Sequence, residues 1–302
     1  MFQPLVSIAV ITYRSEDFVI ETLDSIYNQT YANIELIVSD DGSTDRTIVL
    51  CNDWIKCHKE RFTRTQVITV EKNTGTSANY NRAERACKGD WVMTIDGDDM
   101  LFPYAVEKYV SFVADNPESS YVFARVKAFG DTEKRCHYFE NVVFDPAFFR
   151  LSSQEQLNCL QFEGNCIPSG TCFFNRRVKE KYGIVNDERI PLLEDWPKWI
   201  NVLKEGLNFS YLDLPTLKYR LRESSVSTSK PSVDFRKSNA LFYRYYQFWP
   251  LIKEGRSSYA IIKRMDAEKM IRGRNIFWGS LYKVFLLYRR LKHVEEPLPE
   301  FF

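Results

Sequence analysis

Short apolar segments alternate with helical ones through the first hundred residues, and this alternation constrains the fold more strongly than any other feature. Strands are expected at residues 5–11, 34–38, 66–70 and 90–95. The first of them is a continuous apolar run, which is typical of a strand buried on both faces of a sheet. Helices are expected between them, over residues 16–28, from about 45 to 61 and over 77–87. This repeated order predicts an α/β fold with a doubly wound, mainly parallel sheet.

The pattern changes after residue 99. Further helices are expected from Pro103 onward and over residues 152–162 and 196–205. Further strands are expected at 120–129, 136–144 and 209–221, which would form a small antiparallel subregion. From about residue 229 the pattern is helical, aromatic and basic. We therefore expect one domain over 1–228, with halves 1–100 and 101–228, and a C-terminal helical appendage over 229–302.

Composition excludes several classes of protein. Forty-one basic and 40 acidic residues leave a net charge of +1, which argues against a nucleic acid partner. Seven cysteines without a C-x-x-C pair and only three histidines argue against structural zinc and fit a reducing cytosol. The N-terminal apolar run is too short for a signal peptide, and no stretch has the length of a membrane-spanning helix. A cytoplasmic location is expected.

Three carboxylates follow the fourth expected strand within four positions: Asp96, Asp98 and Asp99. Like charges this close repel each other, so a divalent metal with oxygen ligands is the expected partner. A solvated acidic turn is the alternative, because Asp and Gly favour turns. A second acidic loop, which contains Asp41, ends the second strand and should reach the same sheet edge.

Asp41 has two interpretations. Its carboxylate can accept hydrogen bonds from a nucleobase or a ribose, or it can stabilise a turn. Capping of the following helix is assigned to Ser43 or Thr44. The first strand is followed by Thr12 and Tyr13 rather than by G-x-G-x-x-G, which argues against a dinucleotide-binding enzyme, and a P-loop is also absent.

These motifs together resemble glycosyltransferase family 2, whose members have the GT-A fold. The matching segments are residues 6–13, 29–31, 35–45, 73–75, 88–90, 96–99, 194–196 and 219–227. The resemblance covers about residues 4–228, and the order and spacing of five separate motifs make it specific. Within that family it resembles glycosyltransferases of bacterial polysaccharide and O-antigen assembly.

The resemblance implies roles for individual residues. Tyr13 and Asp41 would lie at the nucleobase, and Asp96 at the ribose or the donor sugar. Asp98, helped by Asp99, would hold Mg²⁺ or Mn²⁺ on the diphosphate. The remaining residues implied at the nucleotide sugar are Thr12, Asn73, Asn81, Arg82 and Arg222.

Two departures from the usual family pattern affect these roles. Tyr80 stands where many members have an arginine, and Arg82 could substitute for it from the next turn. Arg222 stands where many members have a histidine. An arginine there cannot replace a metal-ligating histidine, but it can pair with a diphosphate.

Asp195 is the implied catalytic base, and it also begins the helix expected at 196–205. Asp is among the best residues for capping a helix N-terminus, which is the alternative role. The adjacent Glu194 favours a site, because a cap needs one carboxylate only. The two roles are compatible, since a helix N-terminus keeps a carboxylate ionised. Glu194 would orient the site or the acceptor.

Residues 253–293 carry eleven basic and three acidic side chains, a net charge of +8, with aromatic residues interleaved. A helical appendage with a solvated basic face is one explanation. The other is an amphipathic surface that lies on anionic lipid, at the inner face of the cell membrane.

The sequence therefore predicts an inverting, metal-dependent glycosyltransferase. It would move a sugar from a nucleotide-sugar donor, a UDP-sugar, to a hydroxyl of a glycan or lipid-linked glycan in cell-surface polysaccharide synthesis. A nucleotide-sugar-binding or scaffold protein without catalysis is the main alternative, against which Asp98 and Asp195 argue. A phosphotransferase with an aspartyl nucleophile is a third, but its motif normally ends the first strand rather than the fourth.

Overall fold

A computed structural model of the chain describes residues 2–222 and 232–253, together with residues 255, 256, 260, 263, 264 and 267. The chain forms two compact units: Met1–Leu160 with Asn165–Ser229, and Gln161–Gly164 with Lys230–Phe302. The domain boundary predicted between residues 228 and 229 lies in the stretch 223–231, outside the described residues.

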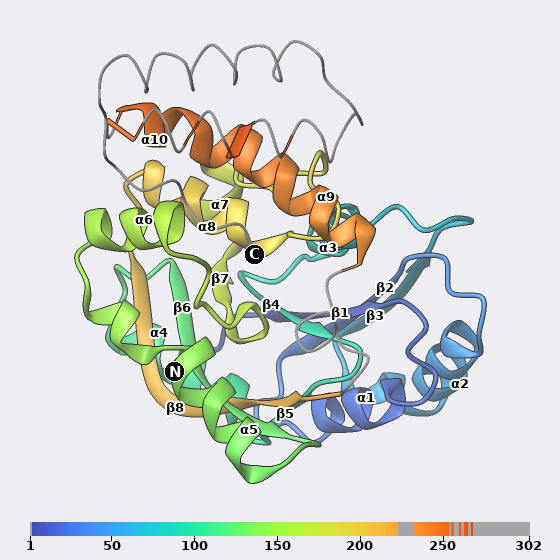
Figure 1. Cartoon of the computed structure of the whole chain (residues 1–302). Helices are drawn as coiled ribbons and strands as arrows, with labels where there is room; N and C mark the ends of the chain where they lie inside the picture. Colours follow the sequence, from blue (N-terminus) through green and yellow to red (C-terminus); the bar gives the residue numbers. More distant parts are fainter. Residues whose placement is uncertain are drawn as a thin grey trace, which may run out of the picture. The chain divides into compact units, whose positions relative to one another are not determined.

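The first unit is built on one mixed sheet of eight described strands, in the order β3-β2-β1-β4-β7-β6-β8-β5 (Figure 1). The strands are β1 (Val6–Thr12), β2 (Ile34–Asp40), β3 (Arg64–Thr69), β4 (Trp91–Asp96), β5 (Met100–Leu101), β6 (Tyr121–Phe129), β7 (Phe173–Asn175) and β8 (Phe209–Arg220). Strands β3, β2, β1 and β4 are parallel, and β7 joins β4 and β6 antiparallel to both. The predicted α/β fold with a mainly parallel sheet is confirmed. Its antiparallel pairs are β7 with β4 and β6, and β5 with β8, whereas β6 and β8 pair parallel.

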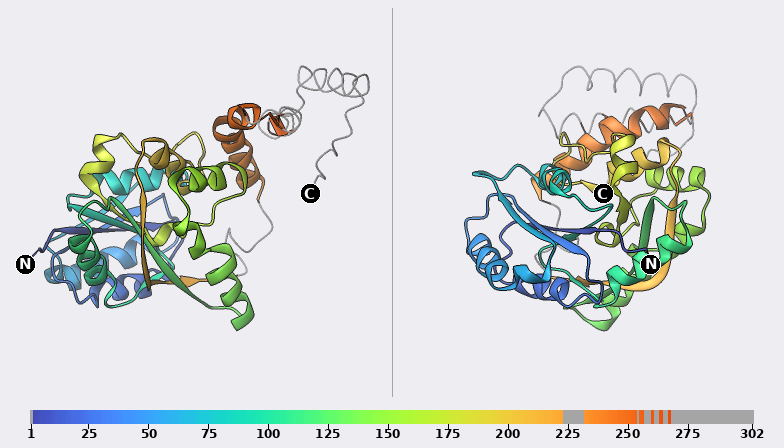
Figure 2. Two further views of the ribbon diagram at one scale, coloured as in Figure 1. Left: turned by 90° about the vertical axis from the view of Figure 1, so that its left-hand side faces the viewer. Right: turned by 180° about the vertical axis from the view of Figure 1, so that it is seen from behind.

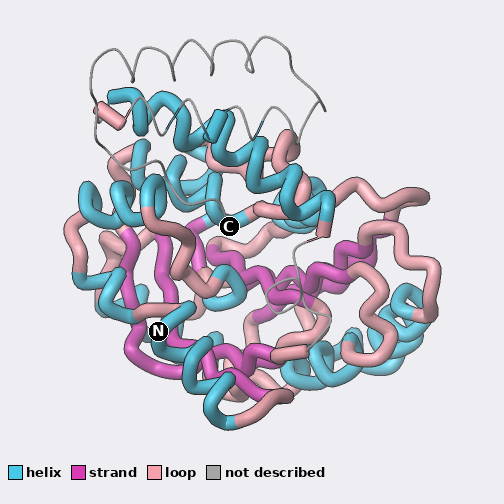
Figure 3. The backbone as a smooth tube through the Cα atoms, viewed as in Figure 1, coloured by secondary structure: helices cyan, strands magenta, loops and turns pink. Residues whose placement is uncertain are grey.

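Helices cover both faces of the parallel strands. Figure 1 shows α1 (Val19–Tyr27) and α2 (Thr47–His58) on one face, and α3 (Thr76–Ala86) on the other. Every residue of β1 and β2 is buried, as expected for strands enclosed between two layers. Apolar side chains of β1, β2 and β4 form one core with those of α1, α2 and α4 (Ala105–Asp115). The strands form the magenta centre of this unit in Figure 3.

The register of the parallel strands brings polar residues to one edge. Thr12 pairs with Asp40 across β1 and β2, and Ile11 pairs with Asp96 across β1 and β4. The acidic loops that follow β2 and β4 therefore begin beside each other, as the sequence predicts.

Shorter elements complete the first unit. They are η1 (Lys59–Arg61), α5 (Glu133–Tyr138), η2 (Phe139–Val143), η3 (Pro146–Arg150), α6 (Ser153–Phe162), η4 (Ser169–Thr171), α7 (Arg176–Lys181) and α8 (Asp195–Lys204). The last two residues of α6 belong to the second unit. The helices predicted from Pro103 and at 152–162 and 196–205 are confirmed as α4, α6 and α8. The strands predicted at 120–129 and 209–221 are confirmed as β6 and β8.

Two local predictions are wrong. Residues 136–144 are helical rather than extended, and Figure 2 shows this helical segment leaving the end of β6. Cys136 and Phe139 are buried at a helical spacing, against Ala128 and Leu221. Neither Ser43 nor Thr44 caps α2, which begins at Thr47. Asp45 instead accepts hydrogen bonds from the backbone amide and the hydroxyl of Thr47.

The second unit includes α9 (Val233–Phe242), η5 (Tyr243–Gln247) and α10 (Phe248–Lys253). Its described core contains Ala240, Tyr243, Leu251, Ala260 and Ala267. Most of the segment 253–293, for which a membrane surface is predicted, lies outside the described residues. Among the helices that are described, none combines the length and the hydropathy that crossing a membrane requires.

Candidate active site

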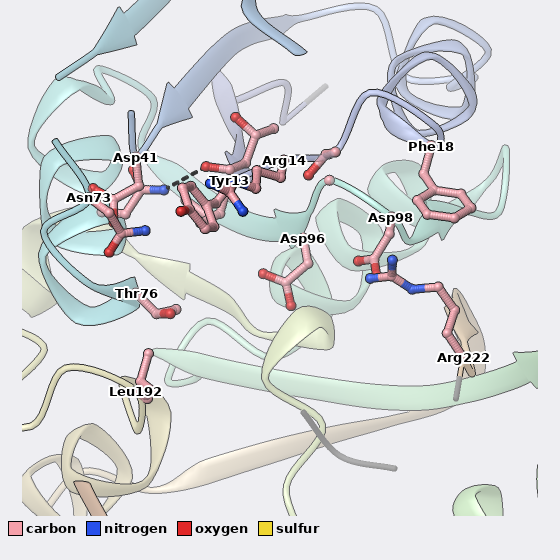
Figure 4. A pocket seen from close by; sticks show the side chains of 15 residues that line it. Tyr13, Arg14, Phe18, Asp41, Asn73, Thr76, Asp96, Asp98, Leu192 and Arg222 are labelled. Atoms are coloured by element: carbon pink, nitrogen blue, oxygen red, sulfur yellow. Dashed lines mark hydrogen bonds and ion pairs between the residues drawn. The ribbon is translucent and has the colours of Figure 1, made fainter. Parts of the chain in front are cut away.

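A pocket of about 450 Å³ opens at the carboxyl edge of β1, β2 and β4 (Figure 4). Seven of the residues predicted to bind the donor or metal line it: Thr12, Tyr13, Asp41, Asn73, Asp96, Asp98 and Arg222. The carboxyl edge of parallel strands is where α/β folds bind their ligands. Tyr13 is 44% exposed, so its ring is free to contact a ligand at the pocket rim.

Asp41 is almost fully buried at the base of the pocket, and its carboxylate accepts four hydrogen bonds. One oxygen accepts from the hydroxyl of Thr74 (2.6 Å) and the guanidinium of Arg82 (2.9 Å). The other accepts from the backbone amides of Thr74 (3.0 Å) and Gly75 (2.8 Å). A carboxylate has about four lone-pair sites. A nucleobase N–H would therefore have to share or displace one of these donors.

The three carboxylates after β4 have different partners. Asp96 accepts a hydrogen bond from the Tyr80 hydroxyl at 2.8 Å, and Asp98 pairs with Arg222. Asp99 is buried outside the pocket lining and accepts from the backbone amide of Arg220 at 2.8 Å. Figure 4 shows Asp96 and Asp98 in the pocket, with Arg222 beside Asp98. Only Asp96 and Asp98 thus face a ligand.

The negative charge of this loop is only partly compensated. Burial and the charge of Asp98 raise the pKa of Asp96 to about 7. The same two causes raise the pKa of Asp99 well above its ordinary value. No three or more His, Cys, Asp or Glu side chains in the described part of the chain converge closely enough to form a metal site. A cation would therefore need oxygen ligands from its substrate as well.

Arg222 lies where the pocket meets the end of β8. Its guanidinium stacks over the Phe18 ring at 4.7 Å and pairs with Asp98. Arg220, two residues earlier, donates to the backbone carbonyl of Asp98 at 2.7 Å and pairs with Glu21. The two arginines hold the Asp98 loop against α1 and place a positive charge in the pocket.

Asp195 is the first residue of α8, and Glu194 precedes it with no capping hydrogen bond from its side chain. The carboxylate of Asp195 accepts from the amide of Asn165 at 2.7 Å and from the backbone N–H of Trp196 at 2.7 Å. Burial raises the pKa of Asp195, and those two hydrogen bonds oppose the rise. Asp195 lies close enough to Asp96 for its charge to raise the Asp96 pKa.

Two residues predicted at the nucleotide sugar have internal roles. Asn81 is buried and bonds the backbone of Asn186 and the carboxylate of Glu188. Arg82 donates to Asp41 and to the side-chain oxygen of Asn79, both at 2.9 Å. Neither lines the pocket. Arg82 thus acts on the pocket through Asp41.

Asn165 and Phe18 are site residues that sequence reasoning missed. Asn165 reaches Asp195 across thirty positions, and no local pattern marks it. Phe18 has the appearance of an ordinary apolar residue before α1 in the sequence. The departure at Tyr80 was visible, but its hydrogen bond to Asp96 depends on α3 packing beside β4.

Comparison with known proteins agrees with this geometry. Residues 7–183 match the family described as glycosyl transferase family 2. The chain belongs to glycosyltransferase family 2, and it is a glycosyltransferase.

Two relatives indicate the breadth of the similarity. The putative teichuronic acid biosynthesis glycosyltransferase TuaG of Bacillus subtilis is 25% identical over 232 residues, which cover 76% of this chain and 84% of that protein. The Escherichia coli UDP-Glc:alpha-D-GlcNAc-diphosphoundecaprenol beta-1,3-glucosyltransferase WfaP is 26% identical over 243 residues, which cover 78% of this chain and 85% of that protein.

Solved structures share the fold. Staphylococcus aureus TarS 1–349 in complex with UDP-GlcNAc superposes with a TM-score of 0.62 at 18% identity, over 95% of this chain and 74% of that one. The mannosyltransferase PcManGT of Pyrobaculum calidifontis, in complex with GDP-Man and Mn²⁺, superposes with a TM-score of 0.58 at 15% identity. The match covers 96% of this chain and 81% of that one. The predicted GT-A fold is confirmed.

Proposed function

We propose that this protein transfers a sugar, with inversion, from a UDP-sugar to a glycan hydroxyl in cell-surface polysaccharide synthesis. The observation that carries the proposal is the pocket itself, which Asp96 and Asp98 line. Asp195 and Glu194 are not among the lining residues, but the charge of Asp195 acts on Asp96. The UDP-Glc in the name of WfaP and the UDP-GlcNAc in the TarS complex support the donor class.

A divalent cation fits the two pocket carboxylates. Mg²⁺ is usually held by one or two carboxylates together with water and substrate phosphates, and Asp98 and Asp96 supply such oxygens. Burial and, after it, the negative charge of Asp98 raise the pKa of Asp96, and a cation would compensate that charge. When bound, Mg²⁺ or Mn²⁺ would stabilise the negative charge that develops on the leaving diphosphate. Asp99 would stabilise the loop through its buried hydrogen bond with the backbone amide of Arg220.

The chain's own residues then have distinct tasks. Arg222 would leave its ion pair with Asp98 and pair with the diphosphate instead, because guanidinium and phosphate groups form bidentate hydrogen bonds. Asp195 would accept the proton of the acceptor hydroxyl, while Asn165 and the Trp196 amide fix the orientation of its carboxylate. Attack from the face opposite the leaving group would invert the anomeric centre. General-base catalysis of this kind contributes roughly 10²–10⁴-fold to the rate.

The test is a panel of nucleotide sugars with and without Mn²⁺, followed by release of the nucleoside diphosphate. We expect metal-dependent release from a UDP-sugar. Asp195→Asn should bind the donor as the wild type does, while transfer to the acceptor falls by roughly 10²-fold or more. Unchanged transfer by this variant would remove Asp195 as the base.

Asp98→Asn tests the metal assignment, and Asp90→Asn is its control. Asp90 is half exposed, lies at the opposite end of β4 and pairs with the surface residue Arg177 at 3.4 Å. The Asp98 variant should lose the stimulation by Mn²⁺, and the control should keep it. Equal metal responses in both variants would refute the role of Asp98.

Peripheral association with membranes is a separate proposal, based on the charge of residues 253–293. The full-length protein should sediment with vesicles that contain phosphatidylglycerol and not with phosphatidylcholine vesicles, and about 0.5 M salt should release it, because the attraction is screened. Binding to neither vesicle would contradict the proposal.

A further inference from the structure

Arg14 has an unusual backbone conformation at the edge of the pocket. Among the described residues it is the only one other than glycine with a positive φ, which is +51°. This left-handed region is disfavoured for residues with a Cβ, and arginine lacks the short polar side chain that lets asparagine or aspartate adopt it. Arg14 lines the pocket two positions after the end of β1. A strained residue at a ligand site suggests that its side chain has a function there.

Hydrogen bonds from a neighbouring loop hold this conformation. The backbone amides of residues 14–16 donate in succession to side chains of the segment 43–47, which follows β2. Their acceptors are Ser43 Oγ (2.8 Å), Thr47 Oγ1 (2.8 Å) and Asp45 Oδ2 (3.4 Å). The backbone amide of Ser43 donates in turn to the buried carboxylate of Asp40 at 2.8 Å. The left-handed turn at Arg14 is therefore imposed by the surrounding structure.

The turn brings two successive side chains to the pocket. In an extended strand such neighbours point to opposite faces, but Tyr13 and Arg14 both line the pocket. The guanidinium carbon of Arg14 lies 5.3 Å from the centre of the Tyr13 ring, within the range of a cation–π interaction. Figure 4 shows the two residues beside each other. The positive φ thus accounts for a guanidinium at the pocket rather than on the other side of the chain.

The charge of Arg14 differs from the other positive charges of the site in having no carboxylate partner within the described part of the chain. Arg222, the second arginine of the pocket lining, pairs with Asp98, and Arg82 pairs with Asp41. The contacts of Arg14 are the Tyr13 ring and, through its backbone, Ser43. Its side chain is exposed. The charge is therefore available to an anionic ligand.

We propose that Arg14 binds the diphosphate of the nucleotide sugar. The inference rests on the proposed function and adds a donor-binding residue that the sequence motifs did not indicate. The diphosphate is the anionic group that all nucleotide sugars share, whereas the base and the ribose are neutral. A guanidinium presents its N–H donors in a geometry that phosphate oxygens accept. The left-handed turn then lowers stability in exchange for a contact with the donor.

Arg14→Gly should change stability and binding in opposite directions. Glycine adopts a positive φ without steric cost, so the thermal midpoint should rise by about 2 °C. The Kd of UDP should rise roughly tenfold, because a charge-assisted hydrogen bond to phosphate is lost. If Arg14 only shaped the loop, the variant would bind UDP as the wild type does, and that result would overturn the proposal.

Arg46→Gly is the matched control. Arg46 is also an exposed arginine, but its φ is −81° and it is not among the lining residues of the pocket. Glycine at this position removes the same charge and relieves no strain, so the thermal midpoint should not rise. At about 0.15 M salt, which screens charges outside the pocket, the Kd of UDP should equal that of the wild type. An equal loss of affinity in both variants would assign the effect to net charge.

Arg14→Gln separates the charge from the flexibility that glycine adds. This variant keeps a side chain on the strained backbone but has no charge. It should weaken UDP binding about as much as Arg14→Gly, while its thermal midpoint stays close to that of the wild type. Wild-type affinity in Arg14→Gln would show that the guanidinium is not the ligand of the diphosphate.

Uridine identifies the part of the nucleotide that Arg14 contacts. Calorimetric titration measures UDP, and displacement of UDP measures uridine, with Mg²⁺ held constant. Both Arg14 variants should bind uridine as the wild type does and lose affinity for UDP alone. Equal losses for the two ligands would overturn the proposal, because uridine has no phosphate. A wild-type protein that binds no UDP would instead contradict the proposed function.

Discussion

At the scale of single residues, the acids of this site differ through their hydrogen-bond donors. Asp41 has four donors. Asp195 has two, which oppose the rise that burial causes in its pKa. Asp96 has one donor from a neighbouring side chain, the Tyr80 hydroxyl, and the pKa of Asp96 is raised. The residue that replaces the usual arginine of the family is thus the one that orients a carboxylate of the pocket.

Tyr80→Phe should weaken donor binding. The change removes the 2.8 Å hydrogen bond to Asp96 and leaves that carboxylate free to turn away from the donor. A hydrogen bond of this kind contributes about 1 kcal/mol, which corresponds to a roughly fivefold rise in the Kd of the donor. Calorimetric titration with UDP-sugar measures the change.

Tyr121→Phe is the control. It also removes a buried tyrosine hydroxyl, but one for which the described part of the chain offers no hydrogen-bond partner. Its donor affinity should equal that of the wild type. A similar loss of affinity in both variants would mean that the Tyr80 hydroxyl acts through general packing.

At the scale of elements, the spacing of apolar residues predicted the helices and strands that pack on the central sheet. The parallel strands and α1 to α4 follow from their apolar spacing, because burial on a sheet requires that spacing. The segment 136–144 has neither a clear strand nor a clear helix pattern. Its helix depends on Cys136 and Phe139 packing against residues such as Leu221, more than eighty positions away. Local sequence cannot supply that contact.

The junction before β4 depends on a glycine. A Cβ on Gly89 would lie 2.6 Å from the backbone nitrogen of Ser7 and 2.8 Å from the backbone oxygen of Leu5. Gly89→Ala should therefore push β4 away from β1 and lower the free energy of unfolding by on the order of 3 kcal/mol. Urea denaturation measures this value.

Gly183→Ala gives the comparison for backbone effects. Gly183 has a φ of +62° and open space where a Cβ would be. The alanine variant should therefore lose stability through its left-handed backbone conformation alone, without a steric clash. That cost is about 1 kcal/mol. If the two variants lost equal stability, steric contact at Gly89 would not be the cause.

At the scale of the whole molecule, the site joins residues from both halves of the first unit. Sequence motifs predicted Asp41, Asp96 and Asp98 in one pocket, because each follows a strand whose end reaches the same edge. They did not predict that Asn165 holds Asp195 or that Lys198 pairs with Glu84, more than a hundred positions away. The first contact arises only when the loop after α6 meets α8, and the second only when α3 and α8 pack together.

That packing predicts how stability depends on pH. Burial would raise the pKa of Glu84, but the charges of Lys198 and Lys179 outweigh it and lower the pKa from 4.5 to about 2. Ionised Glu84 therefore stabilises the folded state above its unfolded pKa, by on the order of 3 kcal/mol. This contribution is lost as pH falls from about 5 toward 2.

Glu84→Gln should remove that contribution and its pH dependence. The variant should be less stable than the wild type at pH 7, and the difference should stay constant down to about pH 5. Below pH 5 it should shrink by about 1.4 kcal/mol per pH unit, because protonation makes the wild-type side chain resemble glutamine. Urea denaturation at pH 7, 5, 4 and 3.5 measures the difference. A constant difference over this range would show that the lysines do not depress the pKa of Glu84, and that the carboxylate stabilises the three helices only through its shape and hydrogen bonds.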